Sequence, residues 1–344
     1  MRKKSFKSFG LVVLAGSLMA VVNAGAAGPE KDAFESNRLL GRGINLGNAL
    51  DAPKEGAWGI TLNEDYFKTI KKAGFNSVRI PISWSTHAEE KAPFAIDPAF
   101  FARVDWAIEQ ALSRGLVAVI DDHHNEGMER EPEKSLPRLK ALWKQIAEHY
   151  RNQPDGLYFE LLNEPNGKLT DELWNEMIPQ LLGVIRESNP RRMIIVGPGQ
   201  WNNLDHLDNL SLPEKGRRLI VTFHYYTPMS FTHQGASWVK GSAKWKGSTW
   251  TATPAQLETL RRDFDKAAAW GKRNGRPLYL GEFGAFSAAD MDSRARWTRA
   301  VAREAKKRGM SWAYWEFASG FGVYDPKGNV WRKPLLNALL DADE

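Results

Sequence analysis

The 344-residue chain contains no cysteine, and no apolar run in it approaches the length of a membrane span. A chain without cysteine forms neither disulfides nor thiolate metal sites and cannot carry a lipoprotein anchor. A membrane-spanning helix needs about 20 apolar residues. We therefore expect stability to come from packing, and we expect no membrane association once any leader is removed.

The first residues carry the three-part pattern of a secretory signal peptide. Four Lys and Arg residues within 2–7 precede an apolar stretch at 9–22 and small residues at 23–26. We predict a signal peptide over 1–27 and a single catalytic domain over 28–344. The protein is then expected to be secreted or periplasmic.

After the predicted leader, the chain also has almost no excess of one sign of charge over the other. Without its four basic residues, 43 Lys and Arg face 41 Asp and Glu, a net charge of +2. Proteins that bind nucleic acid usually carry long basic runs or a basic face, and the chain has no long Lys/Arg block. A nucleic-acid partner is therefore not expected.

What the mature chain does contain is an alternation of short apolar runs with longer amphipathic ones. This rhythm is typical of βα units and of a parallel sheet buried on both faces. Eight strands are predicted, at 42–46, 77–82, 116–121, 157–162, 193–196, 219–223, 277–281 and 311–315.

The stretches between these runs have helical periodicity. Apolar residues recur at three- and four-residue steps over 100–111 and over 139–150. Thr253-Pro254-Ala255-Gln256 has the form of a capping box with proline at the first helical position. Together with the eight strands, these helices predict a single-domain (β/α)8 TIM barrel.

Polar residues follow most of the predicted strands, and the strand ends of a parallel barrel open on one face. Glu164 and Glu282 come directly after the fourth and seventh strands. Two carboxyl groups about 5 to 5.5 Å apart can flank a glycosidic bond, one as nucleophile and one as proton donor. The alternative is that each glutamate forms a structural ion pair.

These glutamates lie in motifs that resemble a known family. Asn163-Glu164-Pro165 and Gly281-Glu282-Phe283-Gly284 are similar to the motifs of family 5 glycoside hydrolases, the large cellulase-containing group of retaining (β/α)8 enzymes. The resemblance covers essentially the whole mature chain and extends to the motifs at residues 42–48, 76–81, 121–124, 224–226 and 312–315.

The resemblance implies a retaining endo-β-1,4-glucanase that hydrolyses a β-linked polysaccharide. Glu164 corresponds to the acid/base and Glu282 to the nucleophile, and Asn163 is expected to bind the 2-hydroxyl of the sugar being cleaved. An endo-β-1,4-mannanase, or an enzyme acting on both polymers, is the alternative on the same site. We expect a monomer.

Other site residues follow from position and from the resemblance together. Arg79 lies in an apolar strand, where its charge requires a buried carboxylate, and the matching arginine of the family keeps the nucleophile ionised. His224 and Tyr226 alternate and so face one side, with the Tyr hydroxyl placed to bond Glu282. Trp315 is expected to be the platform for the glycone sugar.

The run Asp121-Asp122-His123-His124 offers two carboxylates and two imidazoles, which could be read as a metal cluster. Adjacent residues at a strand end face opposite ways, so all four would not reach one ion without a sharp turn. The resemblance instead implies sugar binding by His123, with His124 nearby. We predict no metal and no cofactor.

The segment 226–253 has no helical or strand period and reads as a functional loop. It resembles a loop of family members that act on β-1,4-glucans and, in some cases, β-mannans, which implies subsite contacts for His233 and Trp238. Asn48 and Asp51 are expected to line the same cleft. We expect about half of a set of six loop tryptophans to touch substrate: Trp58, Trp84, Trp201, Trp238, Trp245 and Trp250.

Two other classes of protein would use some of these residues differently. A noncatalytic polysaccharide-binding protein would keep the aromatics without needing both glutamates. A metal-dependent hydrolase would need the histidine pair as ligands and would lose activity in chelator.

Overall fold

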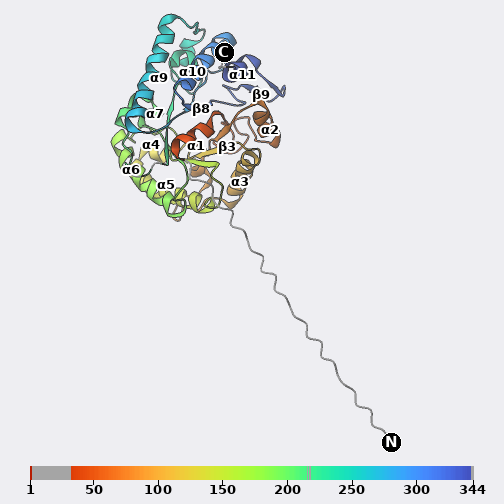
Figure 1. The fold of residues 1–344 in the computed structure, drawn as a ribbon, viewed down its shortest axis with the longest axis vertical. Helices are drawn as coiled ribbons and strands as arrows, with labels where there is room; N and C mark the ends of the chain where they lie inside the picture. Colours follow the sequence, from red (N-terminus) through yellow and green to blue (C-terminus); the bar gives the residue numbers. More distant parts are fainter. Residues whose placement is uncertain (2–31, 215, 217, 342–344) are drawn as a thin grey trace. The chain divides into compact units, whose positions relative to one another are not determined.

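A computed structural model describes residues 1, 32–214, 216 and 218–341 of the chain. Residues 32–341 form one unit built on a closed barrel of eight parallel strands in sequential order, with helices around it (Figure 1). The predicted signal peptide at 1–27 lies outside the described residues apart from Met1. The predicted (β/α)8 fold is confirmed.

All eight predicted strands are present, with ends that differ by a few residues from the expected ones. The barrel strands are β1 (Arg42–Asn45), β2 (Ser77–Ile80), β3 (Val117–Asp121), β4 (Leu157–Glu160), β5 (Ile194–Val196), β6 (Leu219–His224), β7 (Leu278–Glu282) and β8 (Ser311–Tyr314). Their side chains are buried almost throughout, because the barrel interior covers one face and helices cover the other.

The main helices that follow the barrel strands along the chain are α2 (Glu64–Ala73), α3 (Pro98–Leu112), α5 (Pro132–His149), α6 (Asp171–Ser188), α9 (Pro254–Asn274), α10 (Met291–Lys307) and α11 (Lys333–Leu340). Shorter elements are α1 (Ala33–Leu40), α4 (Glu126–Arg130), α7 (Gly199–Asn202), α8 (Met229–Thr232), η1 (Trp84–His87), η2 (Leu204–Asn209), η3 (Ser242–Trp245), β9 (Tyr324–Asp325) and β10 (Val330–Trp331). No helix of the described residues is long and apolar enough to cross a membrane.

The core has two parts, one between the barrel and its helices and a smaller one inside the barrel. The inner part includes Val119, Tyr158, Ile195 and Tyr279. Helix α1 packs beneath it, where Asn37 Nδ2 donates to the Leu278 carbonyl at 3.0 Å. The lower half of the barrel is therefore filled by packed side chains, and the open end lies at the strand C-termini.

The segment 226–253 is less irregular than expected. The short helices α8 and η3 lie within it, because local turns at 229–232 and 242–245 close with i to i+3 and i+4 hydrogen bonds. These helices are too short to produce the repeating apolar pattern on which a sequence prediction depends.

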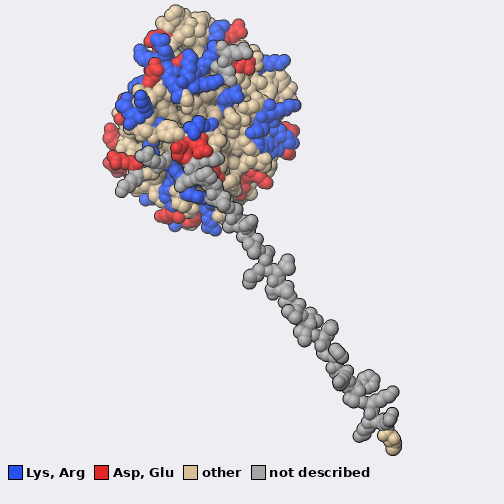
Figure 2. Space-filling model, viewed as in Figure 1, with Lys and Arg blue, Asp and Glu red and all other residues tan. Residues whose placement is uncertain are grey.

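The surface carries both signs of charge. Figure 2 shows Lys and Arg interspersed with Asp and Glu on the face that it presents. The absence of a nucleic-acid partner stays a prediction from the sequence.

The capping box predicted at the start of α9 is present. The Thr253 side chain accepts from the Gln256 N–H, and the Gln256 side chain accepts from the Thr253 N–H. We expect Thr253→Ala to lower the free energy of unfolding by about 1 kcal/mol, because an N–H at the helix start loses its partner. Urea unfolding measures this loss. Thr251→Ala is the control, and an equal loss in both variants would contradict the assignment.

Candidate active site

The C-terminal ends of the barrel strands open into a cleft of about 750 Å³. Residues from the loops after most of the strands line it, so positions far apart in sequence meet there. The predicted site residues that line the cleft are Asn48, Asp51, His123, His124, Asn163, Glu164, Tyr226, His233, Trp238, Glu282 and Trp315.

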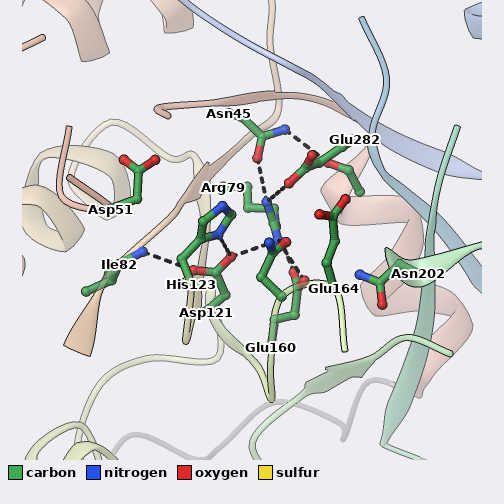
Figure 3. Close-up of polar contacts among 12 residues, drawn as sticks. Asn45, Asp51, Arg79, Ile82, Asp121, His123, Glu160, Glu164, Asn202 and Glu282 are labelled. Atoms are coloured by element: carbon green, nitrogen blue, oxygen red, sulfur yellow. Dashed lines mark hydrogen bonds and ion pairs between the residues drawn. The ribbon is translucent and has the colours of Figure 1, made fainter. Parts of the chain in front are cut away.

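Arg79 lies beneath the cleft, at the centre of the group of side chains in Figure 3, and is fully buried. Its guanidinium group contacts Glu160 at 2.8 Å, Asp121 at 2.7 Å and Glu282 at 2.8 Å. An arginine in this interior requires such partners, because an unpaired buried charge is very costly. Arg79 therefore has the buried carboxylate contact expected from the sequence, and three carboxylates provide it.

Glu282 ends β7 and is 4% exposed. Arg79 Nη1 contacts Glu282 Oε1, and the Tyr226 hydroxyl donates to Glu282 Oε2 at 2.8 Å, as expected from the sequence. Burial raises the pKa of Glu282 to about 7, while His224, Arg79 and the Tyr226 hydrogen bond act in the opposite direction. These contacts favour the carboxylate form that a nucleophile needs.

Glu164 lies opposite, just after β4, in a backbone conformation with φ of 48°. His224 Nδ1 lies 2.7 Å from Glu164 Oε1. Burial raises the pKa of Glu164 to about 8. Arg79 and the Tyr226 hydroxyl contact the Glu282 carboxylate, whereas the Glu164 carboxyl group contacts His224. A proton shared by the two glutamates is therefore favoured on Glu164, the form that a general acid needs.

The two glutamates come close to each other at the cleft floor. One oxygen of Glu164, one oxygen of Glu282 and one nitrogen of His224 all lie within 4.8 Å of one another. Carboxyl groups of retaining glycosidases are about 5 to 5.5 Å apart, whereas inverting enzymes need about 6.5 to 9.5 Å to admit a water. The separation favours the retaining arrangement.

Asn163 is held with its side-chain oxygen toward Arg79. Asn163 Oδ1 accepts from Arg79 Nη2 at 2.8 Å, and its backbone N–H donates to the Asp122 carbonyl. Because Oδ1 is occupied, the amide has its N–H group to offer to a ligand in the cleft. This orientation is compatible with the hydroxyl contact expected for Asn163.

The residues of the Asp-Asp-His-His run diverge. Asp121 Oδ2 contacts His123 Nδ1 at 2.8 Å, whereas Asp122 accepts from Asn125 at 2.7 Å. The four side chains therefore do not surround one point. This agrees with the expectation that adjacent residues at a strand end face opposite ways. Asp51, His123 and His124 have possible ligand atoms within 4.8 Å of one another, but the Asp51 carboxylate already accepts the Asn48 and Ala49 N–H groups.

Aromatic side chains form the walls of the cleft. The Trp315 ring lies parallel to His123 with ring centroids 5.7 Å apart. Gly47 leaves room for this indole, since a Cβ atom there would lie 2.7 Å from Trp315 Cη2. His233 packs edge-on against Tyr226, and Trp238 is 62% exposed at the rim.

Three of the six loop tryptophans line the cleft: Trp58, Trp201 and Trp238. Trp84 is fully buried and donates to the Asp121 carbonyl, so it supports the site from behind. Trp250 is buried beneath α9 and α10, and Trp245 is not among the residues that line the cleft. Large apolar loop residues often pack into the core. Position in a loop therefore did not distinguish the tryptophans that line the cleft from those that do not.

Three residues that support the site were missed as contributors: Glu160, Asn202 and Glu316. The signal for Glu160 was present, because a carboxylate in an apolar strand needs a partner just as Arg79 does. Glu316 is fully buried and accepts N–H bonds from Ala318, Ser319 and Phe321, which shape the loop after β8. Nothing in the local sequence marks that turn.

A parallel barrel with two facing carboxylates at the mouth of a cleft is the arrangement of the glycosidases that use a carboxylate pair. The model of the family Cellulase (glycosyl hydrolase family 5) matches residues 41–320. The chain belongs to this family, and the prediction of a glycoside hydrolase is confirmed.

Individual relatives agree with this membership. Endoglucanase H of Acetivibrio thermocellus is 38% identical over 316 residues, which are 90% of this chain and 34% of the relative. The chain thus spans about a third of the length of that protein. The structure of Thermotoga maritima Cel5A with cellobiose is 51% identical with a TM-score of 0.89, covering 90% of this chain and 100% of that one. Cel5A with mannotriose is 50% identical with a TM-score of 0.88 and the same coverage.

The buried charge cluster predicts a large effect on stability. We expect Arg79→Met to lower the free energy of unfolding by about 3 to 5 kcal/mol, because three carboxylates lose their cation. Denaturant unfolding measures the loss. Arg103→Met is the control, since its ion pair with Glu55 is partly exposed and is worth about 1 kcal/mol or less. Equal losses in the two variants would show that the cluster is not a special contributor.

Proposed function

We propose that the chain is a secreted endo-β-1,4-glucanase that hydrolyses β-glucans with retention of configuration, through a covalent glycosyl-enzyme intermediate. The observation that carries this proposal is the pair of carboxylates within 4.8 Å, only one of which contacts Arg79. The endoglucanase relatives support the substrate class. The predicted signal peptide supports export.

In the first step, Glu282 Oε attacks the anomeric carbon and the bond to the leaving oxygen breaks. Glu164 gives its proton to that oxygen, so the departing chain leaves as an alcohol. Arg79 and Tyr226 hold the nucleophile in place, and Asn163 donates to the sugar hydroxyl next to the reacting carbon. The products are a glycosyl ester on Glu282 and a carboxylate at Glu164.

In the second step, the Glu164 carboxylate takes a proton from a water molecule while the water oxygen attacks the anomeric carbon. The ester bond to Glu282 breaks, and Glu164 regains its proton. Two inversions give net retention. The same residue acts first as acid and then as base, which requires that its pKa respond to the charge on Glu282.

The walls of the cleft suit a polymer of pyranose rings. Trp58, Trp201, Trp238 and Trp315 offer aromatic faces along it, and such faces stack on sugar rings. A mannan is the second candidate substrate, because the similar Cel5A structure was solved with mannotriose.

The test of the substrate class is reducing-sugar release from carboxymethylcellulose, barley β-glucan and β-mannan by the mature protein. We expect glucan hydrolysis that chelator leaves unchanged, and the mannan assay decides whether both polymers are cut. Release from mannan alone would assign the alternative. No release from any of the three would overturn the proposed activity.

The different roles proposed for the two glutamates predict different kinetics for the two variants. We expect Glu282→Gln and Glu164→Gln each to lose about 10³-fold or more in kcat on β-glucan. On a dinitrophenyl cellobioside, whose leaving group needs no proton, only Glu164→Gln should keep a rapid first step, seen as a burst of dinitrophenol. Exposed Glu133→Gln is the control. A burst from Glu282→Gln instead would reverse the assignment.

The protonation of Glu164, the proposed general acid, predicts how kcat/KM depends on pH. Because Glu164 must be protonated for the first step and burial raises its pKa to about 8, kcat/KM should fall as pH rises through about 8. The measurement is a pH profile on cellotetraose. The same profile for Glu164→Gln should lack this basic limb, and a limb that persists there would belong to another group.

A further inference from the structure

The turn after β5 has an unusual backbone beside the catalytic pair. Gln200, Trp201 and Asn202 have φ values of 51°, 61° and 53°, so three consecutive residues are left-handed. Such a run is costly for residues other than glycine. It turns Trp201 outward, 53% exposed in the cleft, and places Asn202 fully inside.

The Asn202 side chain is directed at His224. Asn202 Nδ2 lies 3.3 Å from His224 Nε2, and a backbone bridge between Asn203 and His224 holds the turn against β6. Gly197 makes room for the amide, since a Cβ atom there would lie 2.1 Å from Asn202 Oδ1. The turn and the glycine thus both serve to place this amide.

The opposite nitrogen of His224 faces the catalytic glutamates. His224 Nδ1 is 2.7 Å from Glu164 Oε1 and 3.5 Å from Glu282 Oε2. Burial lowers the pKa of His224, so the ring is neutral and carries one proton. The other charged groups that act on the ring are Arg79 on β2, Asp121 on β3 and Glu160 on β4.

A neutral imidazole has one donor nitrogen and one acceptor nitrogen, and the partner of one determines the other. An amide N–H that donates to Nε2 leaves the ring proton on Nδ1. We propose that Asn202 is a positioning residue that keeps His224 as the Nδ1–H tautomer, which donates to Glu164 Oε1. This inference rests on the proposed role of Glu164.

The consequence concerns where Glu164 carries its own proton. Because Oε1 accepts from His224, the acidic proton lies on Oε2, the oxygen that is left to protonate the leaving group. In the second step the same Nδ1–H bond stabilises the Glu164 carboxylate while it acts as base. One tautomer therefore serves both steps without any proton transfer by His224.

The first test reads the tautomer directly, by long-range ¹H–¹⁵N spectra of protein labelled with ¹⁵N-histidine, at pH 7. The spectrum of His224→Gln identifies the His224 signals among the seven histidines. We expect a protonated Nδ1 and an unprotonated Nε2 in the wild-type protein. An Nε2–H tautomer or an imidazolium would overturn the proposal.

Two variants remove the amide from His224 by different means. Asn202→Gly deletes it while tolerating the left-handed backbone, and Gly197→Ala displaces it sterically. Both should show mixed tautomers, whereas Asn329→Gly, a left-handed asparagine in the β9–β10 turn, should leave the His224 signals unchanged. Wild-type signals in both folded variants would overturn the proposal.

A pH profile separates positioning from a general structural defect. Losing the Nδ1–H donor disfavours the Glu164 carboxylate, so the basic limb of kcat/KM should move to higher pH by about one unit in both variants. If kcat/KM fell by the same factor at every pH and the basic limb did not move, the result would contradict the inference. The tautomer can be measured without any enzymatic turnover. If the wild-type protein were inactive on all glycans, the proposed function would be overturned, but the spectra would still test the His224 tautomer.

Discussion

The site depends on one buried cation. The Arg79 guanidinium lies inside the barrel with carboxylates of β3, β4 and β7 around it, and of these groups only Glu282 lines the cleft. Burial raises the pKa of Asp121, while Arg79 and the Ile82 N–H act in the opposite direction. The position of Glu282, the proposed nucleophile, is therefore determined by an ion cluster that spans the barrel.

The same cluster extends outward to the aromatic wall of the cleft. Asp121 bonds His123, and His123 lies parallel to Trp315. Trp315 in turn requires the space that Gly47 provides. An indole supported in this way loses little side-chain freedom when a ligand stacks on it, because its orientation is set before binding.

The two glutamates have the same chemistry but different neighbours, and this difference is what the proposed division into an acid and a nucleophile rests on. Glu282 contacts a guanidinium and a phenol hydroxyl, and both favour its carboxylate form. Among the described residues, the Glu164 carboxyl group has one hydrogen-bonding partner, the His224 imidazole, whose other nitrogen contacts Asn202. The turn that presents Trp201 thus also places the amide that contacts His224.

The sequence by itself determined the barrel, because alternating apolar runs and amphipathic helices are local patterns, and it placed Glu164 and Glu282 at strand ends that open on one face. It also showed that Arg79 needed a carboxylate. Only the tertiary structure decided which carboxylates these are, that Trp84 lies in the core, and that Asn202 meets His224. Those outcomes depend on register around the closed barrel and on left-handed turns, and neither leaves a periodic signal in the chain.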